Sequence, residues 1–396
     1  MLYDGFVGVL DTESTLSSST PLILDCANGV GANKAEIIAE KFKTYLTFIL
    51  RNTGNTPETA ALLNDHVGAE HAQKEKQPPT NFHAVQDANQ RCSSLDGDAD
   101  RIVYYYFDNT PQHIWHLLDG DKIACLAAFF IGKLLQDAGL QITDQPTHNH
   151  DHHDSTPSTT SSTSSVNLRS APISVGIVQT AYANGASTNY ITSQLKLPVV
   201  RAKTGVKYVH HAATVYDIGV YFEANGHGTV IFHPEFIQRL SSIFENTTLD
   251  NLVKEYTANG VQALRRLYWS TLLINQAIGD ALSDMLMVEI ILLLYKWDIQ
   301  KWDNIYTDLP SRQKKLPVAD RNRIKVNHDE TRILDPIVLQ NIIDEHVQKV
   351  SLGRAFLRPS GTEDVVRVYA EAETQEQADK LADQVIEAAK IHAGGL

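Results

Sequence analysis

Three aspartates alternate with small residues in the segment 96–101, whose sequence is DGDADR. Hard oxygen ligands from one short loop suit Mg²⁺, which usually keeps coordination sites for phosphate or water. A calcium-binding EF-hand loop begins similarly, but it needs Gly at its sixth position and Glu at its twelfth. Arg101 and Phe107 stand at those positions here, which excludes the calcium loop. Asp96, Asp98 and Asp100 are therefore candidate Mg²⁺ ligands, with an acidic surface turn as the open alternative.

A second acidic triplet, Asp119-Gly120-Asp121, stands just before an apolar-periodic stretch that runs to Leu135. An aspartate at a helix start accepts hydrogen bonds from free backbone N–H groups and complements the helix dipole. We therefore predict a helix cap here and assign this triplet no metal.

The segment 358–363, RPSGTE, lies between two apolar runs that read as strands. An arginine, two hydroxyls and an accessible glycine backbone can together hold phosphate oxygens. Arg367 follows in the second strand and adds a guanidinium if it points to the same side as the loop. A plain Pro-Ser-Gly turn with a surface arginine is the alternative.

The segment 223–228, EANGHG, is followed by the β-rich residues 229–232. Its Glu, Asn and His side chains offer acceptors and donors for vicinal sugar hydroxyls, and the glycines allow close approach. The segment 203–207, KTGVK, adds cations just upstream. His227 alone would more often be structural, but its neighbours favour a binding role.

These segments need a scaffold, and the chain reads as alternating β and α elements. The run 21–25, the turn NGVG at 28–31 and the helix-like 34–43 follow in strand, turn, helix order. The turn lacks the third glycine of a dinucleotide-binding fingerprint, so we interpret it as a simple β–α turn. The run 173–179 predicts a strand, and 365–372 predicts another before a helix that Thr374 and Gln377 open as a capping box.

We predict an α/β fold class with two mixed α/β sheet domains followed by a smaller α+β C-terminal domain. The predicted parts are an N-terminal remnant or linker at 1–20, a domain at 21–170 with the acidic loop, a sugar-binding domain at 171–297 and a phosphate-binding domain at 298–396. Residues 144–165 are rich in His, Ser and Thr and predict a disordered insertion. Metal binding by its histidines is the weaker alternative, because no rigid element fixes them.

A formal net charge of -13 argues against a nucleic-acid or anionic membrane surface as partner. Three widely spaced cysteines form neither a disulfide framework nor a metal motif. The N-terminus shows no secretory signal, and the most apolar runs are too short to span a bilayer. We therefore predict a cytoplasmic protein, and the oligomeric state stays open.

The three loops, in this order, resemble those of the α-D-phosphohexomutase family, whose four α/β domains each contribute one loop to a central cleft. The resemblance implies Mg²⁺ as cofactor and a phosphorylated sugar as partner. It further implies that Arg101 helps to bind or activate the reacting group. Hypothetical general acids and bases are Arg101, His227 and Lys207. The implied ligands are Asp96, Asp98 and Asp100 for Mg²⁺, Glu223, Asn225 and His227 for the sugar, and Arg358, Ser360, Gly361, Thr362 and Arg367 for the phosphate.

The sugar loop is similar to the acetylglucosamine branch of that family. Glucose and mannose mutases typically read G-E-x-S-G-H, whereas Phe222 and Asn225 replace the first Gly and the Ser here. The stretches 275–281, 306–310 and 363–369 also resemble this branch. The implied activity interconverts N-acetylglucosamine 6-phosphate and 1-phosphate through a phosphoserine and a 1,6-bisphosphate, for UDP-N-acetylglucosamine synthesis. A phosphoglucomutase or phosphomannomutase is an alternative.

The family's phosphorylated serine lies in a T-A-S-H-N-like loop of the first domain, and we find no such loop in residues 1–396. The serines at 17–19 and 161–165 do not match it. We therefore expect the chain to correspond to domains two to four. Two hypotheses follow: an incomplete mutase, or a non-catalytic phosphosugar-binding or regulatory protein.

Overall fold

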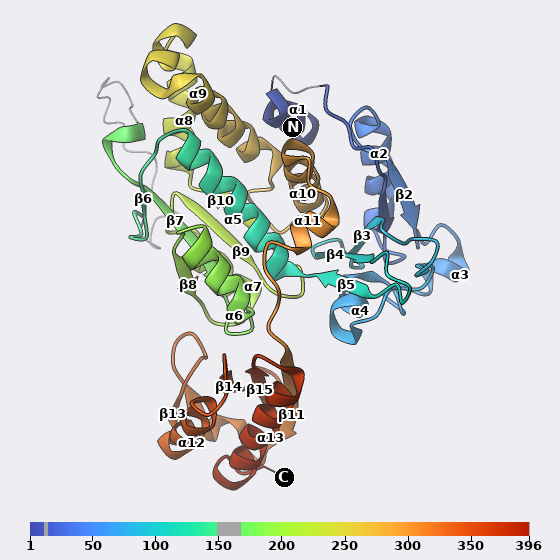
Figure 1. The fold of residues 1–396 in the computed structure, drawn as a ribbon, viewed down its shortest axis with the longest axis vertical. Coiled ribbons are helices and arrows are strands. Elements are labelled where there is room, and N and C mark those ends of the chain that lie inside the picture. The colour runs from blue at the N-terminus through green and yellow to red at the C-terminus, as the bar shows by residue number, and fades with distance from the viewer. Residues whose placement is uncertain (12–14, 149–167, 396) are drawn as a thin grey trace. The chain divides into compact units, whose positions relative to one another are not determined.

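The computed structural model describes residues 1–11, 15–148 and 168–395 (Figure 1). The chain forms two compact units, each made of separate stretches of sequence. Unit 1 consists of Met1–Val178, Ile191–Val199 and His210–Ile305, and unit 2 of Gln179–Tyr190, Val200–Val209 and Tyr306–Leu396. The domain boundaries predicted near residues 170 and 297 stay predictions.

The first sheet of unit 1 has the strand order β2-β1-β3-β4-β5. Strand β1 is parallel to β2 and β3, while β4 is antiparallel to β3 and β5, so the sheet is mixed. The predicted strand, turn and helix at 21–43 are confirmed as β1, a turn and α2. The elements are β1 Leu22–Asp25, α2 Gly31–Phe42, β2 Phe48–Arg51, α3 Pro57–Ala60, α4 Gly68–Glu75, β3 Arg91–Leu95, β4 Ile102–Phe107 and β5 Trp115–Leu118.

The second sheet is also mixed, with the order β10-β9-β7-β6 and β8 paired to β7. Strand β7 is parallel to β9, and β9 is antiparallel to β10. The strand predicted at 173–179 is confirmed as β7, and every one of its residues is buried. The elements are β6 Ile142–Thr143, β7 Ile173–Gln179, α6 Gly185–Asn189, β8 Val199–Arg201, α7 Val206–Ala213, β9 Ile218–Phe222 and β10 Gly228–Phe232.

Long helices fill the interior of unit 1, where α5 contacts β9, α9 and α10 (Figure 1). The helix predicted after Asp119 is confirmed as α5, because the Asp119 carboxylate accepts a hydrogen bond from the Asp121 N–H at 3.0 Å. Among the described residues no helix has both the length and the apolar character needed to cross a bilayer. The helices are α1 Leu2–Leu10, α5 Gly120–Asp137, α8 Pro234–Asn246, α9 Leu249–Leu273, α10 Ala281–Tyr295 and α11 Ile299–Asp303.

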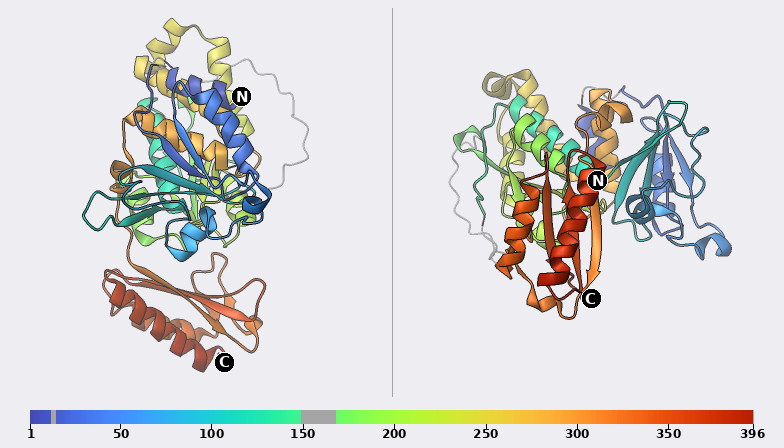
Figure 2. Two further views of the ribbon diagram at one scale, coloured as in Figure 1. Left: turned by 90° about the vertical axis from the view of Figure 1, so that its right-hand side faces the viewer. Right: turned by 60° about the horizontal axis from the view of Figure 1, so that its bottom comes forward.

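Unit 2 contains an antiparallel three-stranded sheet of order β11-β15-β14. Helix α13 lies along one face of this sheet (Figure 2), where Leu357, Val366 and Val368 join Leu381 and Val385 in one apolar core. The predicted N-cap is confirmed, since the Thr374 side chain accepts a hydrogen bond from the Gln377 N–H. The reciprocal half of the predicted capping box is not formed, because Gln377 Oε1 has no hydrogen-bond partner among the described residues. The elements are β11 Ser311–Pro317, β12 Lys325–Val326, β13 Ile333–Asp335, α12 Ile337–Val347, β14 Arg354–Pro359, β15 Val365–Glu371 and α13 Gln375–His392.

The predicted fold class is confirmed, with two mixed α/β sheets before a smaller C-terminal α+β part. The predicted insertion at 144–165 lies outside the described residues from 149 onward.

Candidate active site

The acidic loop connects β3 to β4 in unit 1. Its first carboxylate organises the backbone, because Asp96 Oδ1 accepts hydrogen bonds from the N–H groups of Asp100 at 3.0 Å and Arg101 at 3.1 Å. Ala99 adopts a left-handed φ of 60° between the second and third aspartates. As a result, one oxygen from each of Asp96, Asp98 and Asp100 lies within 4.8 Å of the others.

The electrostatics of this loop fit a divalent cation. Burial and the neighbouring Asp100 and Asp98 raise the pKa of Asp96 to about 7. Oδ1 of Asp100 is buried and lacks a hydrogen-bond partner among the described residues, and the Arg101 Nε lies 3.7 Å from it. A hard cation stabilises carboxylates that lie this close together, because it removes their mutual repulsion. The three residues can therefore hold Mg²⁺.

The turn at 28–31 packs directly against the acidic loop. Val30 N–H donates to the Gly97 carbonyl at 3.0 Å. A Cβ at Gly29 would lie 2.3 Å from the same Gly97 oxygen, so this position requires glycine. The predicted β–α turn is confirmed, and its contact with Gly97 is a role that the sequence analysis missed.

The predicted sugar loop is the hairpin connection between β9 and β10. The Glu223 N–H donates to the His227 carbonyl at 2.9 Å, and the Asn225 side chain accepts from the His227 N–H at 3.0 Å. Gly226 has a φ of 87°, a left-handed conformation that favours glycine. The loop is therefore a tight turn that fixes its three polar side chains close together.

The structure joins the sugar loop to the acidic loop. Arg101 and His227 form an antiparallel bridge, and the Ile102 N–H donates to the Gly226 carbonyl at 3.2 Å. Nδ1 of His227 lies 3.0 Å from Oδ2 of Asp100. A Cβ on Gly226 would lie 2.0 Å from the Ile102 carbonyl oxygen, so the glycine permits this contact. The two loops thus form one site in unit 1.

Helix starts complete this site, and the sequence analysis missed their contribution. Gly120, the first residue of α5, approaches the sugar loop so closely that a Cβ would lie 1.8 Å from the Glu223 carbonyl oxygen. At the first residue of α10, the Ala281 N–H donates to the Ala99 carbonyl at 3.1 Å. The available signals were the glycine between Asp119 and Asp121 and the family-like stretch at 275–281.

The predicted phosphate loop connects β14 to β15 in unit 2, as the sequence indicated. Arg358 and Arg367 are direct partners in the antiparallel register, and Lys315 of β11 is the next partner across Arg367. Residues in register lie on the same face of a sheet, so Arg367 shares the face of Arg358. Glu330 and Glu363 each approach one of these arginines at 3.6 Å and partly offset the repulsion between the like charges. Lys315 was missed because only strand register reveals it.

The loop itself offers the predicted hydroxyl and backbone groups. Ser360 is buried, its N–H donates to the Val365 carbonyl at 2.9 Å, and its hydroxyl accepts from the Thr362 N–H at 3.5 Å. A Cβ at Gly361 would meet no atom within 4 Å, so the backbone there is open to a ligand. This geometry suits the capture of an oxyanion.

The remaining predicted residue, Lys207, belongs to unit 2. Its Nζ lies 4.9 Å from the Tyr208 ring centroid, and Nζ of Lys203 lies 5.2 Å from the same ring. Arg101 and His227, the other two candidate acids and bases, are in unit 1.

Two family models match the chain. One, described as phosphoacetylglucosamine mutase AMG1, domain III, matches residues 158–297. The other, the phosphoglucomutase/phosphomannomutase C-terminal domain, matches residues 309–388. Together they cover the sugar loop and the phosphate loop.

The chain is similar to curated phosphoacetylglucosamine mutases. Phosphoacetylglucosamine mutase of Arabidopsis thaliana is 44% identical over 379 residues, and that of Homo sapiens is 42% identical over 375. The match includes 94% and 95% of this chain but 61% and 60% of those proteins. The chain therefore spans about three fifths of the length of these relatives.

Solved structures agree. The N-acetylphosphoglucosamine mutase of Aspergillus fumigatus, in complex with GlcNAc-6P and magnesium, is 39% identical with a TM-score of 0.80, and the match covers 98% of this chain and 68% of that one. An N-acetylglucosamine-phosphate mutase in its substrate complex is 36% identical with a TM-score of 0.81 and matches 98% and 64% of the two chains. The chain thus belongs to the phosphoacetylglucosamine mutases of the α-D-phosphohexomutase family.

Proposed function

We propose that this chain supplies three loops of a mutase that interconverts N-acetylglucosamine 6-phosphate and N-acetylglucosamine 1-phosphate. The observation that carries the proposal is the 3.0 Å contact between His227 Nδ1 and Asp100 Oδ2, because it joins the sugar loop to the acidic loop in one site. The phosphoryl group would travel through a phosphoserine and a 1,6-bisphosphate. We expect that serine in a segment outside residues 1–396. The product would serve UDP-N-acetylglucosamine synthesis.

In this mechanism the residues of the chain position the substrate and neutralise its charge, which is most of what phosphoryl transfer requires. Asp96, Asp98 and Asp100 would hold Mg²⁺, which supplies charge compensation on the phosphoryl oxygens. The sugar hydroxyls would be bound by Glu223, Asn225 and His227. The distal phosphate would be held by Arg358, Ser360, Gly361, Thr362 and Arg367.

Proton transfer needs a group within hydrogen-bond reach of the sugar hydroxyl. We propose that His227 serves here, since its Nδ1 faces Asp100, which fixes the ring in the joined loops. Arg101 would contact the reacting phosphoryl group, because its Nε lies 3.6 Å from Asp96 Oδ2 at the edge of the acidic loop. Lys207 is the remaining candidate acid or base.

We also propose a cytoplasmic location. The support is that Cys26 and Cys92 are both free and buried. Free buried thiols are typical of proteins in reducing compartments.

Substrate choice tests the proposal. Calorimetric titration of the chain with N-acetylglucosamine 6-phosphate and with glucose 6-phosphate, both with Mg²⁺, is expected to show tighter binding of the acetylated sugar. Asn225→Ser introduces the residue typical of glucose and mannose mutases and is expected to reduce the preference. Equal or tighter binding of glucose 6-phosphate by the unmodified chain would contradict the proposal and favour a phosphoglucomutase.

A further inference from the structure

The guanidinium of Arg358 is held by two side chains that lie far from it in the sequence. Its Nε donates to the Tyr182 hydroxyl at 3.1 Å, and its Nη1 lies 3.6 Å from Oε2 of Glu330. The guanidinium carbon also lies 5.3 Å from the centroid of the Tyr182 ring. All three residues belong to unit 2. Arg358 therefore has a fixed orientation before any anion arrives.

Tyr182 is itself immobilised by the sheet. Its ring packs edge-on against Phe356 and Tyr369, with centroids 5.1 Å and 5.9 Å away. Phe356 and Tyr369 are register partners, and they lie two residues from Arg358 and Arg367 respectively, so they share the face that carries both arginines. The ring thus covers the part of this face next to the phosphate loop.

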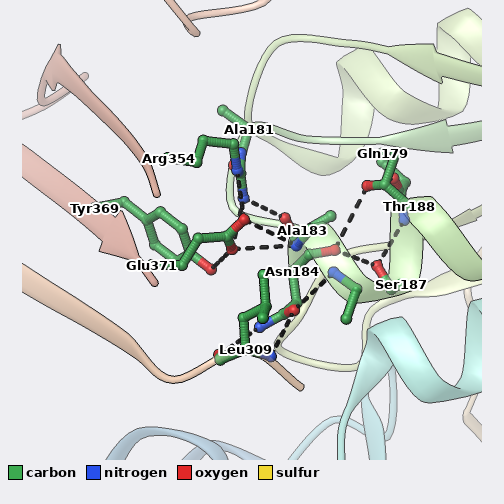
Figure 3. Close-up of polar contacts among 12 residues, drawn as sticks. Gln179, Ala181, Ala183, Asn184, Ser187, Thr188, Leu309, Arg354, Tyr369 and Glu371 are labelled. Carbon is green, nitrogen blue, oxygen red and sulfur yellow. Dashed lines mark hydrogen bonds and ion pairs between the residues drawn. The ribbon is translucent and has the colours of Figure 1, made fainter. Parts of the chain in front are cut away.

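The backbone on both sides of Tyr182 is anchored by the ion pair between Arg354 and the buried carboxylate of Glu371 (Figure 3). Arg354 donates to the carbonyls of Ala181 and Ala183 at 2.8 Å and 2.6 Å. The same guanidinium pairs with the Glu371 carboxylate through contacts of 2.8 Å and 3.0 Å. Glu371 also accepts the Gly185 N–H and the Tyr369 hydroxyl, the latter at 2.7 Å. Tyr182 is therefore held at both neighbouring residues.

Glu330 is equally constrained. It is 4% exposed, adopts a left-handed φ of 60°, and accepts the Thr204 N–H at 3.1 Å through Oε2. A left-handed backbone is unfavourable for a side chain of this type and persists only where its surroundings impose it. The carboxylate near Arg358 is therefore a fixed charge, and it ties the cationic segment 203–207 to the arginine.

We propose that Tyr182 and Glu330 are positioning residues for Arg358 that act on phosphate affinity with opposite sign. Tyr182 pre-orients the guanidinium through a neutral hydrogen bond and so lowers the cost of binding. Glu330 steadies the guanidinium without phosphate, but its negative charge opposes a phosphate on the same group. Phosphate is therefore bound less tightly, which favours its release. The inference rests on the proposed phosphate-binding role of Arg358.

The test uses inorganic phosphate as the probe, titrated by calorimetry into the full chain and two conservative variants. Tyr182→Phe keeps the ring but removes the hydroxyl that orients Arg358. We expect roughly 3- to 10-fold weaker binding, because the Arg358 side chain must then be ordered when phosphate binds. Glu330→Gln keeps the shape but removes the charge, so we expect binding several-fold tighter, on the order of 3- to 10-fold. A merely structural role would weaken binding in both variants.

Matched controls are Tyr208→Phe, which removes another phenol in unit 2, and Glu373→Gln, which removes an exposed charge there. Neither is expected to change the affinity. Weaker or unchanged binding in Glu330→Gln, unchanged binding in Tyr182→Phe, or no phosphate binding by the parent chain would overturn the inference.

A second readout separates this inference from the proposed function. The Nε–H signal of Arg358 in a ¹⁵N spectrum, assigned by its loss in Arg358→Lys, is expected to exchange slowly in the parent chain and rapidly in Tyr182→Phe. Opposite effects on inorganic phosphate without any preference for the acetylated sugar would leave this inference standing and remove the proposed substrate.

Discussion

Two buried carboxylates, Glu371 in unit 2 and Asp284 in unit 1, have opposite surroundings. Glu371 in unit 2 is 1% exposed and is paired with Arg354, Tyr369 and the Gly185 N–H. Asp284 in unit 1 is fully buried in α10, yet among the described residues no cationic side chain pairs with its carboxylate. Unit 2 uses its carboxylate to anchor the chain beside an arginine site. Unit 1 forms its acidic site mainly from backbone contacts and close glycines, and its buried acid avoids charge instead.

The largest predicted effect on stability is at Glu371. Glu371→Ala leaves the Arg354 guanidinium without its carboxylate and frees the backbone at 181–185, so we expect a loss of about 3 to 5 kcal/mol in the free energy of unfolding of unit 2. Urea denaturation monitored in both units measures this. A loss below about 1 kcal/mol would show that the ion pair is no anchor.

The next effect concerns the joined loops of unit 1. Gly226→Ala places a Cβ against the Ile102 carbonyl at a φ of 87°, so we expect a cost of about 1 to 3 kcal/mol. Binding of Mg²⁺ should weaken with it, because the substitution pushes the sugar loop off the acidic loop. Gly361→Ala, where a Cβ meets open space, is the control and should leave stability unchanged.

The sequence located the three candidate loops but gave no signal for Glu371 or Asp284. Each candidate loop holds its polar groups within six residues, at 96–101, 223–228 and 358–363, so residue types and spacing were sufficient to locate it. The partners of Arg358 were invisible, because Tyr182 lies 176 residues away and meets it only through the fold. Gly120 was read only as part of a helix start, since its contact with Glu223 depends on tertiary packing.

A third effect depends on pH. Burial and the nearby Asp280 raise the pKa of Asp284 well above its usual value, so the folded state keeps a proton that the unfolded state releases. Stability from this group is complete below the unfolded pKa of about 4 and falls as pH rises toward the folded pKa, by up to about 1.4 kcal/mol per pH unit. Asp284→Asn should flatten this slope in pH-dependent melting curves. An unchanged slope would mean that Asp284 is paired and charged.

The smallest predicted effect concerns the face of the unit 2 sheet that carries Arg358, Arg367 and Lys315. Lys315→Ala removes the cation that lies in register with Arg367. Because Lys315 is exposed, we expect the substitution to weaken the binding free energy of phosphate by only about 0.3 to 1 kcal/mol. The difference from the parent chain should vanish at high salt, because exposed charges are screened. Lys314→Ala, on the adjacent and opposite-facing position, should have no such effect.

The most direct test of the central claim is a coupled mutase assay and a binding titration on residues 1–396, with Mg²⁺, N-acetylglucosamine 6-phosphate and a bisphosphate primer. The account predicts phosphosugar binding that Arg358→Ala abolishes, without turnover, because the phosphorylated serine is expected outside these residues. Turnover would place that serine within the chain and contradict the expected domain map. No binding by the parent chain would contradict the proposed site itself.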